Sequence, residues 1–153
     1  MTKVQHVYLG ALVWGLVSVG VALVTLAARI TIPAVWPVIV DVITAAIIFM
    51  GGRAAKQQGA KPVGVGVLTG LLFGLVSGWV GFVVHVSRSA LLQCLHGLHL
   101  TSTEVSTELH VANSAAANLG AWVAALVVSV IMGLIFGAIG GATTKSPSAP
   151  QDV

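Results

Sequence analysis

Long apolar runs separated by short polar stretches follow one another along the whole of this 153-residue chain. A transmembrane helix needs about 20 consecutive, mostly apolar residues, and four runs reach that length. They cover residues of about 4–30, 34–52, 63–86 and 118–142. We therefore predict an all-α integral membrane protein, a four-transmembrane-helix bundle that forms a single transmembrane domain over residues 1–142.

Two polar segments lie outside these runs. Residues 143–153 (TTKSPSAPQDV) are rich in Pro and Ser and offer no apolar core, so we expect a disordered cytoplasmic tail. The outer segment 87–117 contains SALLQCLHGLHL, whose leucines share one helical side, which predicts an amphipathic helix in the headgroup region. Thr101 and Glu104 then have the spacing of a capping box, which predicts a second outer helix over about 103–112.

The composition also indicates that lipid is the solvent for most of this chain. It is 57% apolar and only 7% charged, with a mean hydropathy of +1.02, whereas a soluble domain carries about 25% charged residues. A soluble fold of this length could not hide so much apolar surface, which excludes a soluble enzyme and the disordered and collagenous classes. The seven Lys and Arg form no basic stripe, so no nucleic-acid partner is expected. The single cysteine excludes a disulfide framework.

The basic residues near the span ends predict the orientation in the membrane. They divide five to two between the sides: Lys3, Arg53, Lys56, Lys61 and Lys145 against Arg29 and Arg88. We expect a protein integral to the cytoplasmic membrane, with both termini in the cytoplasm and residues 87–117 facing outward. The first apolar run is longer than the core of a signal peptide, so we expect it to be retained, although Leu26-Ala27-Ala28 partly fits a cleavage site.

The two halves of the chain contain similar motifs in the same order. WGLVS at 14–18 matches FGLVS at 73–77, and IFMGG at 48–52 matches IFGAIGG at 135–141. Motifs recurring at the same membrane depth indicate a parallel duplication of a helical hairpin, related by an axis along the membrane normal. The alternative is a chance match between segments rich in Gly, Val and Leu.

Glycines recur at four-residue spacing in the third and fourth runs. In lipid, such a stripe lets helix backbones approach closely, and glycine is costly in a helix interior unless packing requires it. We predict that these residues form helix-packing surfaces, which meet either each other or a second subunit. They are Gly66, Gly70, Gly74 and Gly78 in the third run and Gly133, Gly137 and Gly141 in the fourth.

With Gly-Gly before a short basic loop and a GxxxGxxxG helix after it, the chain resembles several families of small bacterial four-span membrane proteins. The resemblance covers about residues 4–84 and rests on glycine spacing. Those families carry no assigned activity, so it implies location and fold only. The chain is less similar to the small multidrug transporters, because their first span carries an essential Glu and this one has no acidic residue.

Asp41 is the only acidic residue within a predicted span. An ionisable group at that depth is costly and indicates a functional site by default. It would bind a proton, a cation or a cationic ligand, with Arg29 and His85 as candidate polar partners. The alternative is a structural pair between Asp41 and Arg29, or an Asp near enough to the interface to reach water.

The outer segment also collects potential metal ligands. Cys, His and carboxylate side chains are the ligands that zinc favours, but residues two apart on a helix point to different sides. The weak metal candidates are Cys94, His96, His99 and His110, with Glu104 and Glu108 nearby. A bis-histidine haem between His85 and His110 is a further alternative.

The sequence shows no Walker loop, Ser-His-Asp constellation, HExxH motif or paired catalytic carboxylates. We therefore expect a non-enzymatic membrane protein without a cofactor that acts by helix–helix assembly in the lipid bilayer. It would be an accessory subunit of a larger membrane complex or a homo-oligomer. The first alternative is a small transporter or channel that uses Asp41. The second is a metal- or haem-binding membrane protein.

Overall fold

The computed structural model describes residues 2–28, 35–83, 85–94 and 101–145. All regular secondary structure in these residues is helical. The helices are α1 (Lys3–Ala27), α2 (Trp36–Gln57), α3 (Pro62–Ser77), α4 (Val80–Val83), α5 (Arg88–Cys94), α6 (Ser102–Ala112) and α7 (Ala115–Ala142).

Three of these helices, α1, α2 and α7, are long and apolar enough to cross a bilayer. They correspond to the first, second and fourth predicted spans. Helix α2 continues five residues beyond the predicted end at residue 52, because Ala, Lys and Gln are good helix formers. The chain then turns at Gly59, whose φ of +70° is readily adopted only by glycine.

The third predicted span differs from the expectation of one continuous helix over 63–86. Helix α3 ends at Ser77, and the chain resumes as the four-residue α4 after Gly78 and Trp79. The Ser77 hydroxyl donates to the Phe73 carbonyl (2.9 Å), and a Ser–Gly pair is a common place for a helix to kink. At 16 residues, α3 is about 24 Å long, shorter than the roughly 30 Å hydrocarbon core of a bilayer.

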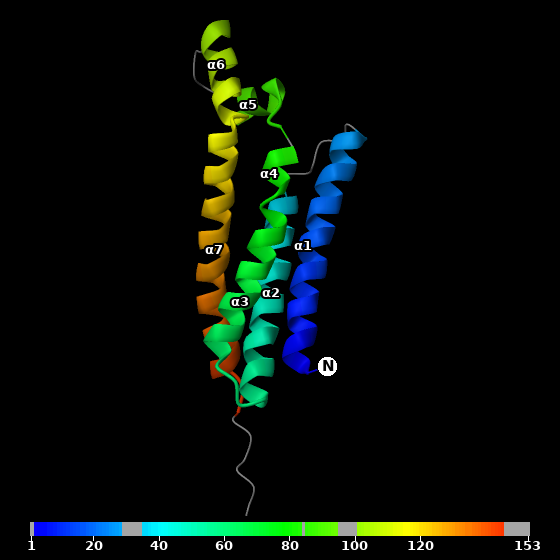
Figure 1. Cartoon of the computed structure of the whole chain (residues 1–153), viewed down its shortest axis with the longest axis vertical. Helices are drawn as coiled ribbons and strands as arrows, with labels where there is room; N and C mark the ends of the chain where they lie inside the picture. The colour runs from blue at the N-terminus through cyan, green and yellow to red at the C-terminus, as the bar shows by residue number, and fades with distance from the viewer. Residues whose placement is uncertain (1, 29–34, 84, 95–100, 146–153) are drawn as a thin grey trace, which may run out of the picture.

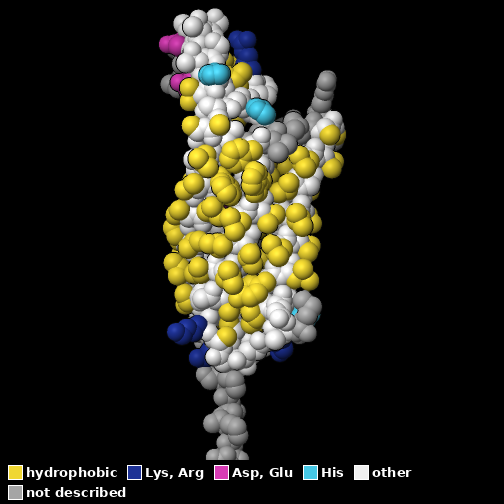
Figure 2. All heavy atoms as spheres, viewed as in Figure 1, with side chains coloured by type: hydrophobic (Ala, Val, Ile, Leu, Met, Phe, Trp, Pro, Cys, Tyr) yellow, Lys and Arg dark blue, Asp and Glu magenta, His cyan; other side chains and the backbone are white. Residues whose placement is uncertain are grey.

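The four longest elements run side by side as one bundle (Figure 1). Helices α1 and α3 run in one direction, and α2 and α7 run in the other. We call the end that holds the start of α1, the α2–α3 turn and the end of α7 the basic end, because Lys3, Arg53, Lys56, Lys61 and Lys145 lie there. Helices α5 and α6 lie at the opposite end. On the face shown in Figure 2, apolar side chains cover the middle of the molecule and acidic ones are seen beside α6.

The interior of the bundle is built mainly from small side chains. The largest fully buried ones are Ile48 and Thr69, and buried glycines line α2, α3 and α7. Small residues let helices approach closely where lipid supplies no hydrophobic drive for association. Packing in this protein is therefore largely backbone against backbone.

Two sets of side-chain hydrogen bonds stabilise the outer helices. The predicted capping box is confirmed: the Glu104 amide donates to Thr101 Oγ1 (3.3 Å), and the Thr101 amide donates to Glu104 Oε2 (2.7 Å). At the α6–α7 junction, the Asn113 side chain accepts from the Val86 amide (2.7 Å) and donates to the Val86 carbonyl (3.1 Å). This pair ties the segment after α4 to the junction. Of the predicted first outer helix, α5 covers the start, and residues 95–100 lie outside the described residues.

Candidate functional site

The structure brings the two predicted glycine stripes together inside one chain. We call the contact of Gly66 and Gly70 on α3 with Ser129, Gly133 and Gly137 on α7 the glycine seam. A Cβ atom added at Gly133 would lie 2.6 Å from the Gly66 carbonyl oxygen and 2.8 Å from the Cα of Val67. One added at Gly137 would lie 3.0 Å from the Cα of Gly66. These neighbours are backbone atoms, so a side chain cannot enter without separating the helices.

The other predicted stripe residues lie at the two ends of this seam. A Cβ at Gly74 would meet the Ser129 side chain at 3.1 Å, and one at Gly141 would meet Pro62 at 2.5 Å. At Gly78 the indole of Trp122 fills the space where a Cβ would lie. Trp122 in turn packs against Trp79 with the rings tilted by 46° and their centroids 5.7 Å apart. The bend between α3 and α4 is thus packed under an aromatic cluster.

Sequence reasoning missed a second close contact, between α2 and α7. A Cβ at Gly52 would overlap the Gly137 carbonyl, and one at Gly140 would overlap the Phe49 carbonyl. The signal was present in the doubled glycines at 51–52 and 140–141, of which only Gly141 was assigned to a packing surface from the sequence. Two adjacent glycines on a helix face different neighbours, so α7 can contact α2 and α3 at the same depth.

Polar side chains from four helices converge on one cavity of about 290 Å³. We call it the polar cavity. Its polar lining comprises Ser18 of α1, Asp41 and Thr44 of α2, Ser77 at the end of α3 and Ser129 of α7. Because Ser77 and Val80 both line it, the cavity lies at the level of the break between α3 and α4.

The hydroxyl hydrogens in this cavity are mostly engaged by the backbone. Ser18 donates to the Trp14 carbonyl (2.9 Å) and Thr44 to the Val40 carbonyl (2.7 Å). With their hydrogens committed, these oxygens remain acceptors, although Thr44 already accepts from the Trp14 indole (3.2 Å). Within the described part of the chain, the Ser129 hydroxyl has no hydrogen-bond partner. The lining therefore favours a cation or a hydrogen-bond donor as ligand.

Asp41 adds a negative charge to this acceptor set. Its side chain is exposed and lines the cavity from the second turn of α2. It forms no ion pair with any residue that the structure describes. Of the two partners considered for it, Arg29 lies outside the described residues, and His85 is exposed near the α6 end. The question of an Asp41–Arg29 pair therefore stays a prediction.

Most of the candidate metal ligands have side chains that the structure does not describe. His96 and His99, and the side chain of Cys94, lie outside the described residues, whereas His85 and His110 are exposed. Among the residues that are described, no group of three or more His, Cys, Asp and Glu lies close enough to hold a metal ion. The metal and haem alternatives stay predictions.

Comparison of this chain with protein-family models, with curated proteins and with solved structures finds no match. The site must therefore be interpreted from its own geometry.

Proposed function

We propose that this chain is an integral membrane protein that binds a small cation, or a solute that donates a hydrogen bond, in the polar cavity. Asp41 would supply the negative charge that attracts this ligand. The observation that supports this function is the convergence of a carboxylate and four hydroxyls from four helices on one cavity. Such a site serves a small transporter or channel and needs no covalent chemistry. The chain is accordingly not proposed to be an enzyme.

The bundle has four spans in this proposal, with the bent α3–α4 unit as the third. The bend supports the placement, because interrupted backbone at membrane depth is tolerated only where protein or a polar cavity covers it. Discontinuous helices are also where transporters form substrate and ion sites, and here the break lies about 24 Å from the basic end. Ser77 and Val80, on either side of the bend, both line the polar cavity.

A duplicated hairpin fits the same cavity. Ser18 and Ser77 occupy equivalent positions in the repeated motifs, and both donate to the carbonyl four residues earlier (2.9 Å each). Both also line the polar cavity. Asp41 has no acidic counterpart in the second half, so the site is asymmetric and holds a single formal charge.

The test is flux and binding in vesicles reconstituted with the whole chain. Proton and monovalent-cation flux are followed with pH- and cation-sensitive dyes, for the wild type, Asp41→Asn and Glu108→Gln. Glu108 is exposed on α6, so its variant removes one carboxylate elsewhere. We expect Asp41→Asn to lower flux by about tenfold or more, because the neutral amide no longer attracts a cation; a tenfold change corresponds to about 1.4 kcal/mol. Equal flux from the wild type and Asp41→Asn would contradict the proposal.

Assembly is the second candidate function, and α6 supports it. This 11-residue helix projects beyond the bundle, and Val105 is its buried residue (4% exposed). A helix so short is marginal in water on its own, so a partner subunit resting on it would stabilise it. The glycine stripes no longer favour assembly, because they contact each other within one chain. The mass of the particle in mild detergent tests this: a strict monomer without a co-purifying subunit contradicts it.

A further inference from the structure

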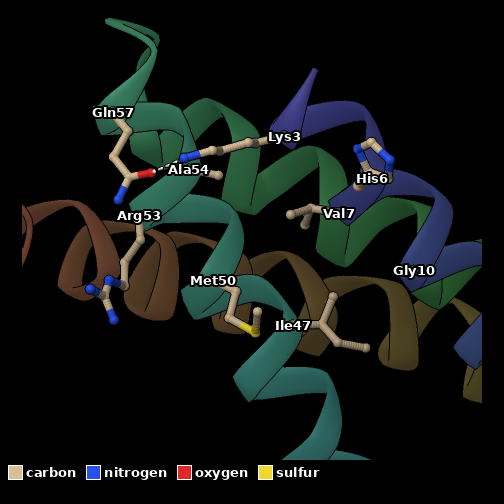
Figure 3. Close-up of a pocket in the computed structure, with 9 residues that line it drawn as sticks. All are labelled: Lys3, His6, Val7, Gly10, Ile47, Met50, Arg53, Ala54 and Gln57. Atoms are coloured by element: carbon tan, nitrogen blue, oxygen red, sulfur yellow. Dashed lines mark hydrogen bonds between the residues drawn. The ribbon is translucent and has the colours of Figure 1, made fainter. Parts of the chain in front are cut away.

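A second, larger cavity of about 600 Å³ lies between α1 and α2 at the basic end. Figure 3 shows Lys3 reaching from α1 towards Gln57 of α2, while Val7 points into the space between the helices. Ile47 and Met50 of α2 form the apolar wall deeper in the bundle. We call this feature the basic groove.

Its polar and apolar parts are separated by depth. Lys3, Arg53 and Gln57 lie at the end of the bundle, His6 lies about one turn further along α1, and Ile47 lies about 15 Å deeper than Gln57 at 1.5 Å per residue. Met50 is 63% exposed, so the apolar wall is continuous with the lipid-facing surface. A groove that changes from cationic to apolar over this distance matches the headgroup and first acyl segments of a phospholipid.

The cationic part lacks a protein counter-charge. The acidic residues that the structure describes are Asp41, Glu104 and Glu108, and Asp41 lies about 18 Å from Arg53 along α2. No ion pair joins Lys3 or Arg53 to a described carboxylate. Instead, the Lys3 ammonium donates to Gln57 Oε1 (3.1 Å), which holds it across the mouth of the groove. The Arg53 guanidinium lies 6.0 Å from the centre of the Phe49 ring.

We propose that the basic groove binds one anionic glycerophospholipid. Lys3 and Arg53 flank its phosphate, since Arg binds phosphate with two parallel hydrogen bonds and Lys binds it as a point charge. One acyl chain lies along Val7, Ile47 and Met50. Basic pockets between transmembrane helices are suited to such headgroups. A free phosphate would leave the apolar wall unused, which is why we assign the groove to a lipid. This binding does not depend on the polar cavity.

The experiment measures lipid binding to the purified full chain by native mass spectrometry, with phosphatidylglycerol and phosphatidylcholine as probes. The variant Lys3→Gln/Arg53→Gln is compared with Lys61→Gln/Lys145→Gln, which removes two charges from the same end but outside the groove. We expect the first to weaken phosphatidylglycerol binding about fivefold per cation, or about 25-fold in total. We expect the second to leave it unchanged.

A third variant tests the acyl part of the site. A Cβ at Gly10, which also lines the groove, meets nothing within 4 Å, so Gly10→Leu adds a side chain at the groove without a clash at its Cβ. We expect it to lose bound phosphatidylglycerol with unchanged circular dichroism.

Three results would each overturn the proposal. Equal affinity of the wild type for the two lipids would show that charge is not recognised. An equal loss in both double variants would assign binding to the general charge of this end. Displacement of the lipid by millimolar inorganic phosphate would assign the site to a soluble anion.

Discussion

The glycine seam makes a sharp prediction at Gly133, where α7 contacts the backbone of α3. In Gly133→Ala, the new Cβ would lie 2.6–2.9 Å from three backbone atoms of Gly66 and Val67, whereas ordinary contact begins at 3.4 Å. The helices must separate by up to about 0.8 Å, which removes a quarter to a half of the contact energy of the atom pairs along the seam. We expect a net loss of about 1–3 kcal/mol, typical of overpacking in a close-packed interior.

The matched control is Gly120→Ala on the same helix, because a Cβ at Gly120 meets nothing within 4 Å. It should be neutral or slightly stabilising, since alanine is the better helix former. The free energy of unfolding is measured by titrating the protein with a denaturing detergent in mixed micelles, followed by tryptophan fluorescence. If Gly133→Ala is as stable as Gly120→Ala, the seam is not as tight as described and our account of its packing is wrong.

Two further predictions concern the α6 end. Asn113→Ala removes both hydrogen bonds to the Val86 backbone. Hydrogen exchange of the Val86 amide should then speed up by about tenfold, consistent with about 1–2 kcal/mol for the two bonds. An unchanged exchange rate would show that these two hydrogen bonds do not hold the segment after α4. Hydrogen bonds from the Thr101 backbone and hydroxyl lower the pKa of Glu104 below its usual 4.5. The stabilisation of α6 is therefore complete above pH 4.5 and is lost as the pH falls through the lowered folded-state pKa. The Cα chemical shifts of α6 should report this loss in the wild type but not in Glu104→Gln, which keeps a capping side chain without a titrating charge.

Local signals in the sequence were sufficient where the deciding interactions are local. The capping box at Thr101 and Glu104 was predicted from a three-residue spacing and is present in the structure. The three long spans could be predicted because about 20 apolar residues have few alternatives to a helix in lipid. In both cases the interacting groups lie within a few residues of each other.

The third span shows where local signals fail. Residues 63–86 are mostly apolar, and hydropathy alone predicts one helix. Ser77 and Gly78 are a local signal for the kink, but the packing of the bend also involves Trp122, a residue 44 positions after Gly78 whose indole occupies the space beside that glycine. The contact of Gly52 with Gly137 is equally non-local. No window of sequence contains both partners.

By itself, the sequence predicted a lipid solvent for this protein, its helical class, the positions of its three long apolar helices and the capping box at the start of α6. It also identified Asp41 as the one carboxylate within an apolar run. Only the tertiary structure decided that the glycine stripes contact each other, that α3 is interrupted, and that Asp41 shares a cavity with hydroxyls from other helices. The physical reason is that spans and caps follow from solvation and hydrogen bonding within a few turns. The glycine seam and the polar cavity depend on which helix faces contact each other, and those faces belong to residues far apart in the sequence.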